Sequence, residues 1–336
     1  MSKICVIYTG GTIGSGVKDG YVSPDSKCIG MLTNEYIKKY GADICFEEIT
    51  PFSMLSENIQ PKNIAALQET VAQALNNDCD GIVITHGTDT LCFSANLLSQ
   101  LFCNATKPIV LVSALLPLAD SQSNGFINFD GGVAFIKEGI PGVYVSFAND
   151  NEPCKIHLAS RVCEPEQITG FMHSIKDLYF GTIIDGKFYH NSADNNPSVT
   201  KICNNASQPE LADIDDNILV IHSRALLNYK MYDIEAMSPK AVVIKLYHSG
   251  TTCTQGDIYN TVEFITRCSN KNIPVILGPV DSEANVYAGM EELADKCIWA
   301  EDISFEMTVV KVMLALGADK DINEVLKGNY FFEKVH

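Results

Sequence analysis

The sequence has little positive charge and no long apolar run, and these two absences exclude several classes of protein. Its 336 residues contain 24 Lys and Arg against 41 Asp and Glu, which gives a net charge of −17. Because a field of that sign repels phosphate backbones, we expect no nucleic-acid partner. No apolar stretch reaches the ~18 residues that a helix needs to cross a bilayer, so we expect no membrane partner either.

Zinc-binding and signal-peptide patterns are also missing. The 12 cysteines form no Cys-x-x-Cys pair and no Cys/His cluster at zinc spacing, so no metal site is expected. Several cysteines, among them Cys5, Cys79 and Cys92, lie within or beside apolar segments, where a free thiol behaves as a small hydrophobe. The first residues already resemble a strand and a glycine turn and not a leader. We therefore expect reduced cysteines and a cytoplasmic location.

Strand and helix patterns alternate along the chain, which predicts an α/β fold. Repeated βα units indicate a parallel sheet with right-handed crossovers and helices on both faces. In the first half, strands are expected at 4–8, 44–49, 82–85, 109–113 and 143–147, helices at 33–40, 61–76, 90–102 and 128–138, and a hairpin at 180–189. In the second half, strands are expected at 218–222, 241–246 and 274–277, and helices at 257–268, 283–293, 306–316 and 321–327.

The composition changes once along the chain. Residues 191–216 are polar and rich in Asn, Asp, Ser and Pro, which is typical of a linker. We therefore predict a larger N-terminal catalytic α/β domain at 1–190, with a parallel sheet, and a smaller C-terminal α/β domain at 217–336. The glycine-rich stretch at 14–30 is too long for a simple βα connection and is expected to be a binding loop or lid.

Two threonine-bearing turns follow buried strands. They are Tyr8–Gly14 (YTGGTIG) and Thr85–Thr90 (THGTDT). In an open α/β sheet, ligands bind beyond the carboxyl ends of the strands. Thr12, Thr88 and Asp89 are therefore expected near one common pocket.

The first turn offers a nucleophile. Gly10 and Gly11 permit a tight turn and a close approach of the backbone to a ligand. Thr12 follows them, but a threonine hydroxyl is a weak nucleophile and needs a partner that removes its proton. Tyr21, on the long loop, is one such partner. The alternative is that Thr12 caps a helix or packs its methyl group.

The second turn also allows two interpretations. Thr88 and Asp89 lie at a predicted helix start, where such residues are common caps. Asp89 is equally suited to bind the ammonium group of an amino acid, with Thr88 assisting proton transfer. His86 is either a general base or a structural residue that donates hydrogen bonds. The glycines of the first turn do not fit Gly-x-Gly-x-x-Gly, so a dinucleotide site is set aside.

Taken together, the two turns resemble the signature motifs of the L-asparaginase/glutaminase family. Both motifs occur in the expected order, and similar segments run through nearly the whole chain. These further segments are Ser56-Glu57-Asn58 followed by Pro61, Ser113-Ala114 followed by Pro117, Asn128, and Glu306-Met307-Thr308 through Leu316-Gly317.

The resemblance implies an amidohydrolase that cleaves the side-chain amide of L-asparagine, or of L-glutamine, to the acid and ammonia. In that family pattern Thr12 attacks the amide and forms an acyl-enzyme, with Tyr21 assisting. Thr88 and Asp89 orient or activate the nucleophile, and Asp89 also meets the substrate's α-amino group. Backbone N–H groups near Thr88 stabilise the oxyanion.

The resemblance also implies the substrate-binding residues and the assembly. Ser56 and Glu57 hold the α-carboxylate and α-amino groups, and Gly87 and Ala114 complete the substrate-binding set. No metal or organic cofactor is implied. The expected partners are a small amino-acid amide and further copies of the chain, as a homodimer or a dimer of dimers.

One departure concerns the lysine that the family carries beside the Thr–Asp pair. Arg161, in Ala159-Ser160-Arg161-Val162, stands at or near its place, and Lys155 would replace it only if the chain were rearranged. Arginine stays protonated and cannot act as a base, although it can hold a carboxylate. Three interpretations stay open: a hydrolase with arginine as electrostatic organiser, a shifted substrate, and a weakened site that acts as an amino-acid-binding or sensor protein.

A related class is the asparaginase-like subunit of a tRNA-dependent amidotransferase. Such subunits carry an extra N-terminal domain, whereas the nucleophile turn lies at the start of this sequence. The acidic charge also disfavours RNA. We therefore rank this alternative below the amidohydrolase.

Overall fold

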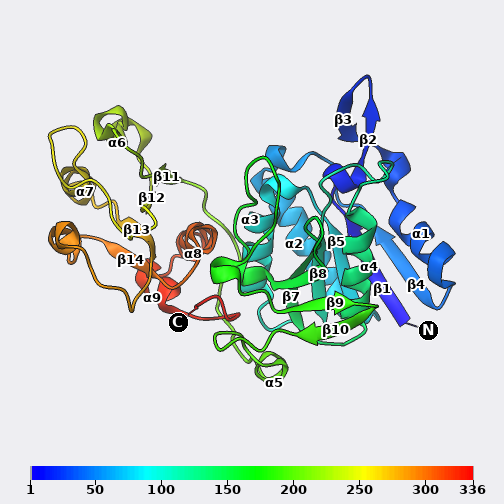
Figure 1. Ribbon diagram of the computed structural model, residues 1–336. Helices are drawn as coiled ribbons and strands as arrows, with labels where there is room; N and C mark the ends of the chain where they lie inside the picture. Colours follow the sequence, from blue (N-terminus) through cyan, green and yellow to red (C-terminus); the bar gives the residue numbers. More distant parts are fainter. Residues whose placement is uncertain (1, 336) are drawn as a thin grey trace. The chain divides into compact units, whose positions relative to one another are not determined.

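The structure is a computed structural model that describes residues 2–335, and it confirms the predicted α/β fold (Figure 1). The chain divides into two compact units. The larger unit runs to Pro209 and also includes Tyr330–Phe332, whereas the smaller runs from Glu210 to Asn329 and resumes at Glu333. None of the helices within residues 2–335 is long and apolar enough to cross a membrane.

The larger unit begins with β1 and ends its regular structure with α5. Its strands are β1 (Ser2–Tyr8), β2 (Ser15–Lys18), β3 (Tyr21–Pro24), β4 (Ile44–Ile49), β5 (Gly81–Thr85), β6 (Pro108–Val112), β7 (Gly142–Phe147), β8 (Cys154–Leu158), β9 (Gly181–Ile184) and β10 (Lys187–His190). Its helices are α1 (Met31–Tyr40), α2 (Pro61–Asn76), α3 (Thr88–Leu101), α4 (Gly125–Ile136) and α5 (Val199–Cys203). Short 3₁₀ turns are η1 (Thr12–Gly14), η2 (Ser26–Cys28), η3 (Ser56–Asn58), η4 (Ala159–Arg161) and η5 (Ile175–Asp177).

Within residues 2–335, the main sheet has eight strands in the order β10-β9-β8-β7-β6-β5-β1-β4. The strands from β4 to β7 in this order are mutually parallel, and β8, β9 and β10 are added antiparallel. The chain passes from β1 to its neighbour β4 and then to β5 on the other side of β1. The strand order therefore reverses between β1 and β5, and ligands of open α/β sheets bind at such a switch point.

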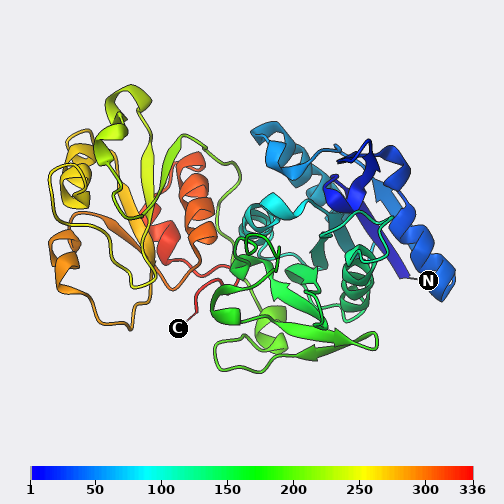
Figure 2. The same ribbon diagram turned by 45° about the horizontal axis from the view of Figure 1, so that its top comes forward.

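The sheet has an apolar core on each face because successive side chains of a strand point to opposite sides. On β1, Ile4 and Val6 belong to one core, and Cys5 and Ile7 belong to the other. Helices α1 and α4 cover the first face, and α2 and α3 cover the second. Figure 2 shows the central strands between these two helix layers. The strands β5 and β6 are buried on both faces, which explains their continuous apolar sequences.

Two segments of this unit differ from the expectation. The stretch at 14–30 contains the hairpin β2–β3, whose turn at Asp19 and Gly20 has φ angles of 53° and 82°. Two consecutive residues with positive φ suit a tight hairpin turn, and Asp-Gly is a favoured pair there. Residues 191–209, expected as a linker, pack with the larger unit and include α5, whose Ile202 lies in the core.

The smaller unit has its own parallel sheet and core. Within the described residues its strand order is β11-β12-β13-β14. Its elements are β11 (Ile218–His222), η6 (Tyr229–Met231), α6 (Ile234–Met237), β12 (Ala241–Lys245), α7 (Thr261–Ser269), β13 (Val275–Val280), η7 (Ala288–Leu293), β14 (Ile298–Glu301), α8 (Phe305–Gly317) and α9 (Ile322–Lys327). The prediction of a helix at 283–293 is wrong. In this range the structure has only the 3₁₀ turn η7, at Ala288–Leu293.

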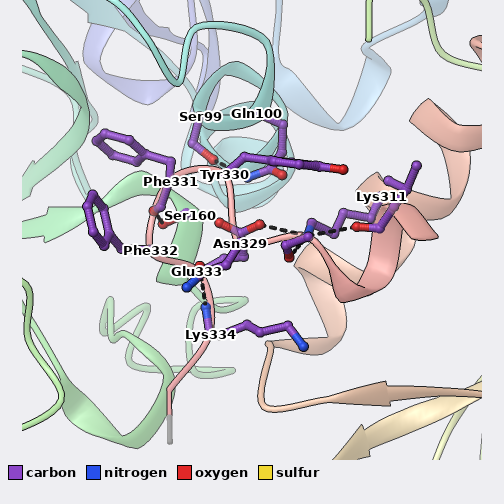
Figure 3. A network of polar contacts seen from close by, with 12 residues as sticks. Ser99, Gln100, Ser160, Lys311, Asn329, Tyr330, Phe331, Phe332, Glu333 and Lys334 are labelled. Carbon is purple, nitrogen blue, oxygen red and sulfur yellow. Dashed lines mark hydrogen bonds and ion pairs between the residues drawn. The ribbon is translucent and has the colours of Figure 1, made fainter. Parts of the chain in front are cut away.

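A buried ion pair lies in the smaller unit (Figure 3). Lys311 on α8 and Glu333 in the C-terminal segment are both fully buried, with 2.6 Å between Nζ and Oε1. Lys311 Nζ also donates to the carbonyl oxygens of Val325 and Gly328, at 3.0 and 2.6 Å. Burial lowers the pKa of Lys311. These contacts fasten the C-terminal segment to α8 and to the end of α9.

Candidate active site

The two threonine turns lie on neighbouring strands at the switch point of the larger sheet. The last residues of β1 and β5, Tyr8 and Thr85, are paired in register. Thr9 Oγ1 donates to the carbonyl oxygen of Thr85 at 2.6 Å. The structure therefore brings the two turns together, as their positions after parallel strands predict.

Gly11 and Gly87 are the points at which the turns touch. Gly11 has a φ of 73°, and a Cβ added to it would lie 2.3 Å from the main-chain nitrogen of Gly87. A Cβ on Gly87 would in turn lie 2.4 Å from Ser56 Oγ. Because no side chain fits at either place, the glycines are required by close packing of three segments.

The third of these segments leads to Ser56. The amide of Gly11 donates to Met54 O at 2.8 Å, and the amide of Met54 donates to Thr9 O at 3.1 Å. Thr90 Oγ1 donates to Ser56 O at 3.0 Å. Met54 thus ties this segment to the first turn, and Thr90 ties Ser56 to the second.

Ser56 carries a buried hydroxyl that has no hydrogen-bond partner within residues 2–335, although the side chain is only 5% exposed. Ser113, at the end of β6, has a second hydroxyl of this kind. Buried polar groups in native proteins are normally hydrogen-bonded, and an exception calls for an explanation. A polar ligand at this rim would satisfy the Ser56 hydroxyl.

Ala114 closes the rim from the β6 side. A Cβ on Gly125 would lie 3.1 Å from Ala114 Cβ and 3.4 Å from Ile13 Cγ1, so Ala114 and the first turn flank the start of α4. Asn128 fixes this edge, because its Nδ2 donates to Ser113 O at 2.8 Å and its Oδ1 accepts from Ala148 N at 2.7 Å.

The helix-capping interpretation of the threonines does not fit the structure. Gly11 is the N-cap of η1 and Gly87 is the N-cap of α3, and neither element has a side-chain cap bond. Thr12 and Thr88 are partly buried first residues of these elements, and Asp89 is exposed in the first turn of α3. The unpaired N–H groups of a helix start and its dipole favour negative charge at this place.

His86 is a structural residue by its contacts. It is buried, its Nδ1 lies 2.9 Å from Gly87 O, and its Nε2 lies 2.9 Å from Ser94 Oγ. Because a carbonyl oxygen only accepts, Nδ1 carries the proton and Nε2 accepts from Ser94. Burial lowers the pKa of His86, which keeps the ring neutral. Both ring nitrogens are therefore occupied, Nδ1 by Gly87 and Nε2 by Ser94.

Besides Asp89, two further expected site residues lie at the surface. Tyr21 begins β3, opposite Lys18 in the hairpin, and is 78% exposed. Figure 1 shows this hairpin projecting from the rest of its unit. Glu57, next to Ser56 in η3, is also exposed. The described contacts do not bring Tyr21 to Thr12.

Arg161 is buried, with 2% of its surface exposed, and three of its donor bonds go to oxygens away from the turns. Its Nε donates to Phe332 O, and its Nη1 donates to Asn195 O at 3.0 Å and to Asn196 Oδ1 at 3.1 Å. Lys155 is paired with Glu152 at 2.8 Å and lies 5.0 Å from the ring centroid of Tyr179.

Sequence reasoning did not find Met54 or the function of Thr90. Met54 acts through its main-chain atoms, which leave no signal in the sequence. Thr90 is the last residue of the THGTDT motif. It has a non-helical φ of −121° and donates to Ser56 O. Its place in the motif is the only sequence signal for this contact. Within residues 2–335, no group of three or more His, Cys, Asp or Glu side chains is placed to hold a metal.

Comparisons with known proteins give the family of the chain. The family model described as "Asparaginase, N-terminal" matches residues 3–193. The L-asparaginase of Thermococcus kodakarensis is 27% identical over 332 residues, which cover 97% of this chain and 96% of that protein. The solved structure of the thermostable L-asparaginase from Thermococcus kodakarensis has a TM-score of 0.80 and 26% identity, and the match covers 99% of both chains.

A second kind of relative is a glutamyl-tRNA(Gln) amidotransferase subunit of Methanobrevibacter smithii. It is 26% identical over 338 residues, which cover 97% of this chain and 74% of that protein. The fold, the two turns and these matches define an asparaginase-type amidohydrolase. The chain belongs to the asparaginase family.

Proposed function

We propose that the protein hydrolyses the side-chain amide of L-asparagine to L-aspartate and ammonia, and that L-glutamine is its second candidate substrate. The observation that carries this proposal is the junction of Gly11, Gly87 and Ser56, where the buried Ser56 hydroxyl lacks a partner among the residues that the structure describes. The junction sits at the switch point, beside both threonines and beside Asp89.

The proposed reaction has two halves. Thr12 Oγ attacks the amide carbon of the substrate, and the hydroxyl proton passes to the leaving nitrogen. Ammonia then departs, and the acyl group stays on Thr12 as an ester. Water then attacks the ester, and the proton it loses restores the threonine hydroxyl. Thr88 and Tyr21 are the proposed proton carriers, and Asp89 orients them. Tyr21 reaches the site only when its hairpin moves toward Thr12.

The proposed binding mode follows from the same geometry. The Ser56 hydroxyl and Glu57 together bind the α-carboxylate and α-amino groups of the substrate. Asp89 also pairs with the α-amino group. Gly87 and Ala114 form the walls. The N–H groups at the start of α3 face the developing oxyanion, an interaction often worth about 3 kcal/mol.

An alternative function is supported by Arg161. Residues 159–162 contain no lysine, and three donor bonds of Arg161 go to oxygens outside the turns. A site without the family's lysine would bind aspartate or asparagine with weak turnover or none. This alternative is an amino-acid-binding or sensor protein.

We propose further that the protein acts in the cytoplasm as a homodimer or a dimer of dimers. Its 12 cysteines are all free thiols, which suits a reducing compartment. Size-exclusion chromatography with light scattering measures the oligomeric state. A monomer at micromolar concentration would contradict this part of the proposal.

Ammonia release from L-asparagine and L-glutamine at equal concentrations tests the hydrolase. Release that disappears in Thr12→Ala supports a Thr12-dependent amidohydrolase. No release from either amide, together with a rise in melting temperature with L-aspartate, would support the binding protein. Release that persists in Thr12→Ala would overturn the assignment of the nucleophile.

A further inference from the structure

The C-terminal segment Tyr330–Phe332 is held by its main chain within the larger unit. Three consecutive carbonyl oxygens accept from three side chains: Tyr330 O from Asn205 Nδ2 at 2.9 Å, Phe331 O from Ser160 Oγ at 2.6 Å, and Phe332 O from Arg161 Nε. Figure 3 shows Ser160 directed at this segment beside Phe331. Such bonds fix a segment by its backbone, independent of its side chains.

The ring of Phe331 adds an apolar anchor. It is 1% exposed, its centroid lies 6.0 Å from that of Tyr144, and a Cβ on Gly142 would lie 2.2 Å from it. The glycine thus makes room for the ring. Backbone bonds and ring packing together give the segment one defined position.

Arg161 joins this segment to a second one. Its guanidinium bonds Phe332 O on one side and Asn195 O and Asn196 Oδ1 on the other. The side-chain amide of Asn196 in turn donates from Nδ2 to Tyr179 O at 2.9 Å. A planar guanidinium can serve several acceptors in fixed directions, whereas a lysine ammonium is a compact point charge. The buried charge is tolerated only because these oxygens surround it.

The chain next to η4, the turn that carries Arg161, is hydrogen-bonded to α3. Asn96, buried on α3, donates from Nδ2 to Val162 O at 2.8 Å and to Cys92 O at 2.7 Å. Val162 directly follows η4, and α3 packs on η4. The first turn of α3 carries Thr88 and Asp89, and the non-helical Thr90 joins them to the regular part of the helix that carries Asn96.

We propose that Arg161 is a positioning residue: it fixes η4 to the C-terminal segment, and η4 in turn fixes α3 through Asn96, which sets the place of Thr88 and Asp89. Arg161 on this proposal does not do the work of the family's lysine. The proposal rests on the function proposed above, but its geometric part is independent of turnover.

Arg161→Lys is the decisive variant, because it supplies the family's residue while removing the guanidinium. We expect kcat for L-asparagine to fall about tenfold or more with KM within about twofold, because a small displacement of catalytic groups costs rate more than binding. If lysine is the residue the site needs, kcat will stay the same or rise, and the proposal is overturned. Arg267→Lys is the matched control, because Arg267 donates to Tyr229 O and Tyr232 O in the smaller unit.

Hydrogen–deuterium exchange separates this proposal from the proposed function. In ligand-free Arg161→Lys, amides of 88–101 should exchange faster than in the wild type, whereas those of 261–269 should not. Unchanged exchange at 88–101 would overturn the positioning role even if the enzyme is active. If the wild type releases no ammonia, the exchange result still decides the geometric part.

Ser160→Ala keeps the test valid if Arg161→Lys does not fold. It removes only the bond to Phe331 O. Faster exchange at 88–101 with a lower kcat and an unchanged KM would support the proposal. Wild-type exchange and wild-type kcat in this variant would contradict it.

Discussion

Gly11 and Gly87 meet backbone to backbone, so that a single added carbon on Gly11 would lie 2.3 Å from the nitrogen and 2.4 Å from the Cα of Gly87. Real Cβ atoms do not approach other atoms this closely. The contact joins the turn after β1 to the turn after β5, and it fixes the separation of Thr12 from Thr88. The contact therefore sets how closely the two turns approach at the switch point.

Gly11→Ala should therefore abolish activity. The backbone of Gly11, with φ 73° and ψ −178°, lies in a region that is essentially confined to glycine and costs about 1–3 kcal/mol for a residue with a Cβ. The clash with Gly87 also pushes the turns apart. We expect kcat/KM to fall by more than about 10²-fold, because a displacement of about 1 Å has that effect on positioned groups. Steady-state ammonia release measures it.

Gly289→Ala is the control for that substitution. Gly289 has no positive φ, and an added Cβ meets only Thr254 Oγ1 at 3.4 Å. Its activity should equal that of the wild type. Wild-type activity in Gly11→Ala would show that the two turns do not need this separation.

Ser56→Ala should separate binding from stability. The Ser56 hydroxyl has no hydrogen-bond partner in the described part of the chain, so its removal breaks no bond there and should leave the free energy of unfolding unchanged or slightly higher. KM should rise about tenfold because a bond to the substrate is lost. Urea unfolding and initial rates on L-asparagine give the two quantities.

Ser304→Ala should show the opposite pattern. Ser304 is the N-cap of α8 and accepts from Met307 N at 3.0 Å, so its loss should cost about 1 kcal/mol of stability with no change in KM. If Ser56→Ala loses stability and keeps its KM, the Ser56 hydroxyl is a structural group and not a substrate ligand.

Two buried histidines make stability fall at acid pH. Burial lowers the pKa of His157 to about 3, with smaller contributions from Lys155 and His173, and burial also lowers the pKa of His86. Below pH ~6.5 the unfolded chain binds protons that these folded rings do not, so stability decreases as the pH falls. For His157 the loss at pH 5 should be about 2 kcal/mol.

Urea unfolding at pH 7 and pH 5 measures this loss. His157→Gln should lose less stability between the two pH values than the wild type. His248→Gln, at an exposed position, should keep the wild-type difference. An equal difference in all three proteins would mean that His157 is not the cause.

The sequence predicted the sheet best where burial is complete. β5 and β6 are apolar throughout because both faces are covered, and such strands are recognisable from composition alone. The hairpin β2–β3 was not predicted because its side chains are mostly exposed, and only Asp19-Gly20 indicates the turn. The path of Tyr330–Phe332 depends on bonds to its carbonyl oxygens, which no side-chain pattern records.

The site was predictable to the extent that it follows from strand order. Thr12 and Thr88 come shortly after the adjacent parallel strands β1 and β5, so the βα pattern predicts that the two residues lie near each other. Ser56 arrives through main-chain pairing of Met54, which only three-dimensional packing reveals. The sequence placed Arg161 after a strand, but the direction of its side chain depends on the distant residues Asn195 and Phe332.

Lys311→Met should strongly destabilise the smaller unit. Lys311 and Glu333 are both fully buried and paired at 2.6 Å, so the substitution takes the ammonium charge away from a buried carboxylate. Loss of one partner from a buried pair typically costs about 3–5 kcal/mol. Urea unfolding followed by the fluorescence of Trp299, which lies in this unit, measures the change.

The double variant Lys311→Met/Glu333→Gln distinguishes the loss of the charge from the loss of the hydrogen bonds of Lys311. If the cost of Lys311→Met comes from the loss of the ammonium charge beside Glu333, neutralising Glu333 should restore most of the lost stability, since replacing both members of a buried ion pair is often close to neutral. If the double variant is as unstable as Lys311→Met, the cost lies instead in the bonds of Lys311 Nζ to Val325 O and Gly328 O, which hold the end of α9.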